Sequence, residues 1–145
     1  MSAVRRRLRS LALLELINIP LWGWAAFGAL GLPATALDLA GFALFALLLA
    51  EGAGYWLAKL CQTGRTVPGL WFFRAARLIN PVLLAAGLIL TVTGRAWAGL
   101  FFTGFAVLEH VNYFHVQLMY DNRADLRRLA RRGFRRSHLA RDLAA

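Results

Sequence analysis

Acidic residues, lysine and cysteine are all scarce in this sequence. The 145 residues include 7 Asp and Glu against 17 Lys and Arg, which gives a formal net charge of +10. Lys59 is the single lysine and Cys61 the single cysteine, so an intrachain disulfide and a CxxC redox or zinc motif are both excluded. A glycine-rich phosphate loop and a serine nucleophile elbow are also missing. The sequence therefore implies no cofactor.

A metal site is not expected either. Carboxylate-bridged helical bundles use a Glu-x-x-His spacing, but the residue three positions after Glu109 is Asn112. On one continuous helix His110 and His115 would point to different sides, so they would not ligate the same ion.

Hydrophobic residues dominate what is present. They make up 59% of the chain, whereas charged residues make up 17%, and the mean hydropathy is +0.55. Soluble domains are roughly 45–50% apolar and about 25% charged, so this composition indicates a membrane protein. The basic residues gather at the two ends and in one central loop, which favours contact with an anionic membrane surface over nucleic-acid binding.

Four apolar segments approach or exceed the roughly 20 residues that a helix needs to cross the hydrocarbon. They cover residues 11–32, 37–60, 75–92 and 97–120, and turns rich in Gly, Pro, Thr or Arg separate them. Apolar runs of this length without alternation predict helices and not strands. We therefore predict an all-α fold with a four-transmembrane-helix bundle over residues 1–122.

The arginines predict the orientation of this bundle. Basic residues precede the first segment, surround the connection between the second and third, and recur after the fourth, whereas the other two connections contain only Arg95. By the positive-inside rule both ends of the chain lie in the cytoplasm. We expect a multi-pass protein of the bacterial cytoplasmic membrane.

Two polar motifs recur in the same order along the chain. Glu-Leu-Ile-Asn at 15–18 matches Arg-Leu-Ile-Asn at 77–80, and Glu-x3-Tyr at 51–55 matches Glu-x3-Tyr at 109–113. We interpret these matches as an internal duplication. It predicts two tandem helical hairpins of the same topology, a parallel repeat whose axis runs along the membrane normal.

Every glutamate lies inside a predicted span. Glu51 and Glu109 are expected about 14 Å from the cytoplasmic helix ends, near the bilayer midplane, where an unpaired carboxylate is costly. Polar residues spaced by three or four positions continue the same helix faces, which predicts a polar cleft open to the cytoplasm. The candidate substrate-binding residues are Glu15, Asn18, Glu51, Tyr55, Lys59, Arg77, Asn80, Glu109, Asn112, Tyr113, His115 and Gln117.

Packing offers an alternative explanation of these polar residues. Glu51 with Lys59, Glu109 with His115 or Glu15 with Arg77 would then be ion pairs that hold the helices together, and the Asn and Tyr side chains would be interhelical hydrogen-bond partners.

The tail at residues 123–145 combines basic residues with the spacing of an amphipathic helix. It is too polar to span a membrane and predicts an interfacial helix on the anionic inner leaflet. A topology anchor without further role is the alternative. Aromatic residues are not interleaved with the arginines, so nucleic acid is not an expected partner. The candidate membrane-surface residues are Arg127, Arg128, Arg131, Arg132, Arg135 and Arg136.

Three function classes fit these features. A transporter or channel for a small polar or cationic solute is favoured, with proton coupling through Glu51 and Glu109, and four helices make so thin a wall that a homo-oligomer is expected. The first alternative is a membrane enzyme that acts on a lipid or isoprenoid, with Glu51 or Glu109 as general acid or base. The second is a structural or signalling subunit. A polar stripe that continues outward would favour transport, and a closed outer half would favour the enzyme.

Overall fold

The computed structural model describes residues 3–62, 66–118 and 133–144 of the chain, and the regular elements within them are helices. In chain order they are α1 (Ala3–Gly23), its π-helical continuation η1 (Trp24–Ala29), α2 (Ala36–Leu60), α3 (Leu70–Thr93), α4 (Trp97–Phe114) and the short α6 (His138–Asp142). The predicted all-α class is confirmed.

Three of these helices are long and apolar enough to cross a membrane: Ala3–Ala29, Ala36–Leu60 and Leu70–Thr93. This finding agrees with the predicted membrane class. α4 has 18 residues, carries Glu109, His110 and Asn112 near its end, and is not one of these three helices. A fourth crossing by α4 stays a prediction.

Helix α2 begins and ends within one residue of the predicted span, whereas α4 ends earlier than predicted. The predicted end was residue 120, but the helix stops at Phe114, because His115 leaves the helical region with φ −128° and ψ −77°. Residues 135–137 then form hydrogen bonds with the backbone of residues 115–117, which a longer helix would need for its own hydrogen bonds. The N–H of Gln117 donates to the carbonyl of Arg135 over 2.9 Å, and the N–H of Ser137 donates to the carbonyl of His115 over 3.2 Å.

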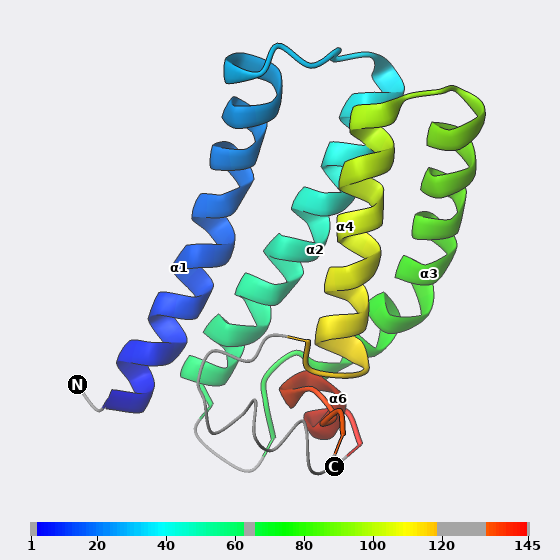
Figure 1. Ribbon diagram of the computed structural model, residues 1–145. Helices are drawn as coiled ribbons and strands as arrows, with labels where there is room; N and C mark the ends of the chain where they lie inside the picture. Colours follow the sequence, from blue (N-terminus) through cyan, green and yellow to red (C-terminus); the bar gives the residue numbers. More distant parts are fainter. Residues whose placement is uncertain (1–2, 63–65, 119–132, 145) are drawn as a thin grey trace.

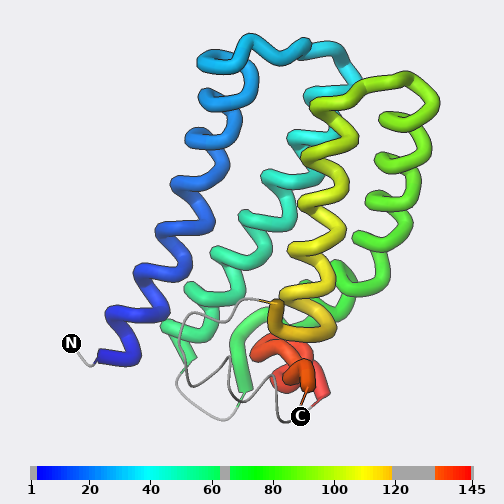
Figure 2. The backbone as a smooth tube through the Cα atoms, viewed as in Figure 1, coloured from blue at the N-terminus to red at the C-terminus, as the bar shows by residue number. Residues whose placement is uncertain are grey.

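The helices form two hairpins that point the same way. Figure 1 and Figure 2 show α2 and α4 in the middle of the bundle, with α1 and α3 at its sides. The α1–α2 and α3–α4 connections lie at one end, called here the loop end. The N-terminus, α6 and the C-terminus lie at the other end, called here the terminal end. This arrangement is compatible with the predicted topology.

In the loop half of the bundle, α2 and α4 pack closely against each other. A Cβ atom on Gly99 of α4 would lie 2.6 Å from the carbonyl oxygen of Leu37 in α2, so only glycine permits this approach of the two backbones. The Asp38 carboxylate accepts the Gly99 N–H over 2.9 Å and also closes a capping box with Thr35. Phe42, Phe45 and Phe102 fill the interior beside this contact, with ring centroids 5.0–6.1 Å apart. The buried polar side chains described in this half, Asp38, Thr91 and Thr103, all form hydrogen bonds with backbone groups.

Candidate functional site

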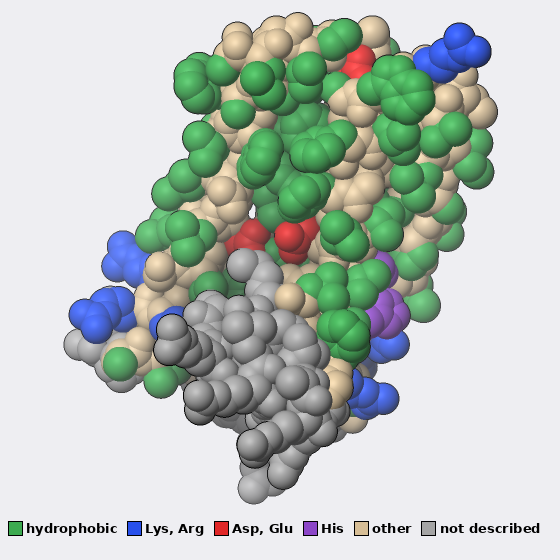
Figure 3. Space-filling model, viewed as in Figure 1, with side chains coloured by type: hydrophobic (Ala, Val, Ile, Leu, Met, Phe, Trp, Pro, Cys, Tyr) green, Lys and Arg blue, Asp and Glu red, His purple; other side chains and the backbone are tan. Residues whose placement is uncertain are grey.

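Two glutamates from different helices meet at Tyr113 in the terminal half of the bundle. The buried Tyr113 hydroxyl of α4 donates a hydrogen bond of 2.5 Å to Glu15 Oε1 of α1. Glu109, one turn before Tyr113, lies close enough to interact electrostatically with both Glu15 and Tyr113. Figure 3 shows acidic side chains side by side on the face between α1 and α4, with hydrophobic side chains above them. We call Glu15 and Glu109 the glutamate pair.

Gly52 of α2 makes room for the tyrosine that joins this pair. A Cβ atom at position 52 would lie 2.5 Å from the Tyr113 hydroxyl oxygen, so a larger residue there would displace the ring. The site therefore depends on three helices: α1 supplies Glu15, α4 supplies Tyr113 and Glu109, and α2 supplies the space.

The glutamate pair has no basic partner among the residues that the structure describes. Its polar contacts are with Tyr113 and with Asn112, whose amide donates to Glu109 over 3.4 Å. Two neighbouring carboxylates in a poorly hydrated site repel each other, and a proton or a cation between them removes that cost. The arrangement can therefore bind a proton, a metal cation of low charge or an organic cation.

Glu51 lies in a separate network and does not share the pair. Its carboxylate accepts a 2.7 Å hydrogen bond from the Asn80 amide of α3, and the two side chains are 7% and 2% exposed. No described contact joins Glu51 to Glu109. The amide satisfies this carboxylate inside the protein and clamps α2 to α3, as the packing alternative expects for buried polar residues.

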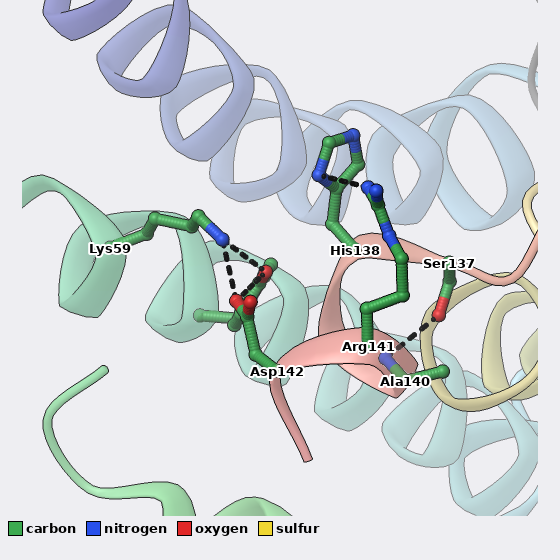
Figure 4. A network of polar contacts seen from close by, with 7 residues as sticks. Lys59, Ser137, His138, Ala140, Arg141 and Asp142 are labelled. Carbon is green, nitrogen blue, oxygen red and sulfur yellow. Dashed lines mark hydrogen bonds and ion pairs between the residues drawn. The ribbon is translucent and has the colours of Figure 1, made fainter. Parts of the chain in front are cut away.

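Tyr55 and Lys59 bind the C-terminal helix and are separated from Glu51 as well. Lys59 Nζ lies 2.5 Å from Asp142 Oδ2, and the Tyr55 hydroxyl donates to the same oxygen over 2.6 Å (Figure 4). Asp142 was not among the predicted site residues, because it follows Lys59 by 83 positions. The only signal available was that Asp142 is one of two aspartates in a mainly basic tail.

The described part of the tail differs from the predicted interfacial helix. Residues 135–137 run back along the end of α4, and Ser137 then starts the short α6, its side-chain oxygen accepting the Ala140 N–H over 3.1 Å. The Ser137 hydroxyl itself donates to the carbonyl of Tyr113. Arg135 is half-buried and Arg136 is exposed. The other four predicted membrane-surface arginines, Arg127, Arg128, Arg131 and Arg132, lie outside the described residues.

His110 and His115 lie together, so the expectation that they point to different sides is wrong. The helix ends at Phe114, and the His115 ring consequently turns back to 5.5 Å from that of His110. His110 also stacks on Phe114, with centroids 4.8 Å apart. The described residues contain no group of three or more metal-ligating side chains.

The remaining predicted residues are dispersed around the terminal half. Arg77 is exposed on α3 and makes no ion pair with Glu15. Asn112 accepts the Leu118 N–H over 2.8 Å and thereby holds the chain beyond α4. Asn18 is half-buried one turn after Glu15, and Gln117 is half-buried in the segment that follows α4. The structure therefore divides the predicted cleft residues among several contacts.

A separate apolar cavity of about 220 Å³ opens between η1 and α4, nearer the loop end. The Trp22 ring lies 6.3 Å from the rings of both Phe101 and Phe105, so aromatic side chains continue from the cavity along α4. This cavity and the glutamate pair are both formed between the first helix and α4. The lining residues are Trp22, Ala26, Leu30, Leu32, Phe101 and Phe102.

The chain matches no protein-family model, no curated protein and no solved structure. Its function is therefore argued from the chemistry of these sites.

Proposed function

We propose that this protein is a small membrane transporter for a small polar or cationic solute, coupled to protons through the glutamate pair. The proposal includes a fourth crossing by α4, a cytoplasmic terminal end and a homo-oligomer that completes the thin wall. The observation that carries it is the hydrogen bond between Tyr113 and Glu15 beside Glu109. Carboxyl groups inside a membrane domain are costly and are typically kept for ion or proton pathways.

The glutamate pair also couples binding to helix movement. The Tyr113–Glu15 hydrogen bond joins α1 to α4, whereas the packing of α1 is mainly against α2. A proton or cation on Glu15 competes with the tyrosine hydroxyl for the same oxygen. Occupancy of the pair therefore shifts the balance between α1 attached to α4 and α1 released from it.

The closely packed loop half supports the direction of loading. Gly41, Gly99 and the phenylalanine rings close the space between α2 and α4 there, whereas the glutamate pair lies in the terminal half. Solute would enter from the cytoplasmic side in this state, and a movement of α1 would expose the pair to the outside. The parallel repeat inferred from the sequence provides the interface at which such a movement takes place.

Proton coupling can be measured with purified protein in liposomes that contain the pH-sensitive dye pyranine. The probes are Na⁺, K⁺ and a panel of small primary and quaternary amines. We expect at least one probe to change the internal pH with the wild-type protein, and Glu15→Gln and Glu109→Gln each to abolish the change.

Glu51→Gln is the matched control for this experiment. A glutamine oxygen still accepts the hydrogen bond from Asn80, so proton coupling should persist in this variant. Folded Glu15→Gln and Glu109→Gln variants that transport like the wild type would contradict the proposal, and would leave a structural or signalling subunit as the better description.

The apolar cavity favours a second candidate, a membrane enzyme that acts on a lipid or isoprenoid. A chain in the cavity would place its polar end toward the glutamate pair, with Glu15 or Glu109 as general acid or base and the Tyr113 hydroxyl as a hydrogen-bond donor. The closely packed loop half is compatible with this candidate as well. Mass spectrometry of a lipid extract after incubation distinguishes the two: an enzyme converts a lipid with wild-type protein and not with Glu109→Gln, whereas a transporter converts none.

A further inference from the structure

A second group of polar side chains lies at the terminal end, between α3 and α4. It consists of Arg77 on α3, His110 on α4 and His115 just beyond α4, and we call it the basic cluster. Arg77 and His115 both lie close enough to His110 to interact electrostatically with it. Figure 3 shows histidine next to basic side chains there, away from the acidic side chains of the face between α1 and α4. Adjacent helix positions differ by about 100°, so Glu109 and His110 face different neighbours.

His110 is the unusual member of the cluster. Its side chain is only 5% exposed, and neither ring nitrogen has a hydrogen-bond partner among the described residues. Buried polar side chains nearly always have such a partner, and leaving one unpaired costs stability. The ring is held by stacking on Phe114 and by the edge of His115. A ligand that offers an acceptor oxygen would satisfy its N–H group.

The charge of the cluster indicates which ligand fits. Arg77 is exposed, and no described carboxylate forms an ion pair with it. His115 is also exposed, and its ring lies 5.5 Å from that of His110. Two groups that can donate hydrogen bonds thus lie near His110, and no described carboxylate pairs with Arg77. Arginine binds phosphate oxygens in a bidentate manner, and basic pockets between membrane helices on the cytoplasmic side accommodate phosphate headgroups.

We propose that the basic cluster binds a phosphate group at the cytoplasmic surface of the membrane. Arg77 binds two of its oxygens, and His115 turns from its position beside His110, so that both imidazole rings donate to the same group. His115 can turn because it lies beyond the last helical residue, Phe114. The phosphate belongs either to an anionic phospholipid of the inner leaflet or to a free phosphate ion. This site is separate from the glutamate pair and does not depend on the proposed transport.

The test uses the full chain in detergent micelles with ¹⁵N-labelled histidine. The side-chain nitrogen signals of His110 and His115 are followed by NMR, and His138→Gln assigns the third histidine. One arm adds short-chain phosphatidylglycerol and the other adds inorganic phosphate. We expect saturable shifts of the His110 and His115 signals in at least one arm. Shifts with the lipid alone identify a headgroup site, and shifts with both identify a site for the phosphate group itself.

Variants separate this site from general attraction of anions to a basic protein. Arg77→Gln should weaken binding about tenfold or more, because it removes charge-assisted hydrogen bonds. Arg95→Gln, which removes an exposed arginine at the loop end, should leave the affinity unchanged. His115→Gln provides a second variant in case Arg77→Gln does not fold. The proposal is overturned if neither arm shifts the His110 signal, or if Arg95→Gln weakens binding as much as Arg77→Gln.

Discussion

Tyr113 contacts three different parts of this molecule. Its hydroxyl donates to Glu15 of α1, its ring fills the space that Gly52 leaves on α2, and its carbonyl accepts the Ser137 hydroxyl. This residue thus links α1 and α2 through its side chain and the returning tail through its backbone. Substitutions at these contacts should change both the stability of the protein and the geometry of the glutamate pair.

Gly52→Ala tests this role of Tyr113 by adding a single methyl group beside its ring. The added Cβ would lie 2.5 Å from the Tyr113 oxygen, so the ring must move and its bond to Glu15 should break. Overpacking of this kind costs about 1–3 kcal/mol. We expect thermal unfolding in detergent at a lower temperature than for the wild type, together with loss of proton coupling.

Gly54→Ala is the matched control for this substitution. No atom lies within 4 Å of a Cβ at position 54, and alanine favours the helix over glycine. This variant should be at least as stable as the wild type. If Gly52→Ala and Gly54→Ala unfold at the same temperature, Tyr113 is not held by close packing against α2.

At the scale of elements, α6 is held by a few polar contacts beneath the helix ends. Lys59 and Tyr55 of α2 bind Asp142 (Figure 4), and Ser137 binds the end of α4. Leu139 and Ala140 are buried between these contacts, so docking of α6 covers apolar surface as well. The position of this short helix is decided by long-range contacts and not by its own propensity, because five residues do not form a stable helix alone.

Docking of α6 should depend on pH through Asp142. Burial raises the pKa of its carboxyl, but the hydrogen bonds from Lys59 and Tyr55 lower it further, so the folded pKa lies below the usual 3.8. The contact therefore contributes fully well above pH 3.8 and is lost as the pH falls below that value. We expect hydrogen-exchange protection factors at Ala140, corrected for intrinsic rates, to fall between pH 5 and the acid range.

Asp142→Asn should reproduce the acid behaviour at neutral pH, with a loss of about 1 kcal/mol of local protection. Arg141→Gln is the control on the same helix, since the Arg141 guanidinium contacts His138 within α6 itself. Protection that is equal at pH 5 and in acid, in the wild type, would show that the ion pair does not hold α6.

At the scale of the whole molecule, the two hairpins place both chain ends and the α2–α3 connection at the terminal end (Figure 1). Cys61 is exposed just after α2 and is the only cysteine of the sequence. Labelling of its thiol therefore shows on which side of the membrane the terminal end lies. The positive-inside rule assigns this end to the cytoplasm.

A membrane-impermeant maleimide tests this topology. We expect Cys61 to be unlabelled in intact spheroplasts and labelled in inverted vesicles. The variant Arg95→Cys with Cys61→Ser should show the opposite pattern, because residue 95 lies in the α3–α4 connection. Labelling of both positions from the same side would exclude a crossing by α3, the helix that lies between them.

Several features of this fold could be predicted from composition and periodicity. The apolar runs locate α2 to within one residue, because hydrophobic length alone specifies a membrane helix. The end of α4 could not be found this way. His115, Val116 and Gln117 continue the apolar and polar pattern of the helix, but residues 135–137 bind their backbone and stop it. That competition involves residues about twenty positions apart, which periodicity does not detect.

The residues of the candidate site could be predicted from the sequence, but the contacts between them could not. Glu15, Tyr113 and Glu109 were all selected as polar residues within apolar runs, since a charge in hydrocarbon is costly wherever the helix packs. Spacing along one helix grouped Glu51 with Tyr55 and Lys59. The structure separates them, because Asn80 and Asp142 approach α2 from two different elements.

The amino-acid sequence by itself determined that this chain is helical and suited to a membrane, because apolar length and the location of positive charge act one segment at a time. Only the tertiary structure decided which carboxyl meets which partner, because that depends on the rotation of each helix about its axis and on close contacts such as Gly52 with Tyr113. Helix rotation is set by packing between segments distant in the chain, and no local pattern contains it.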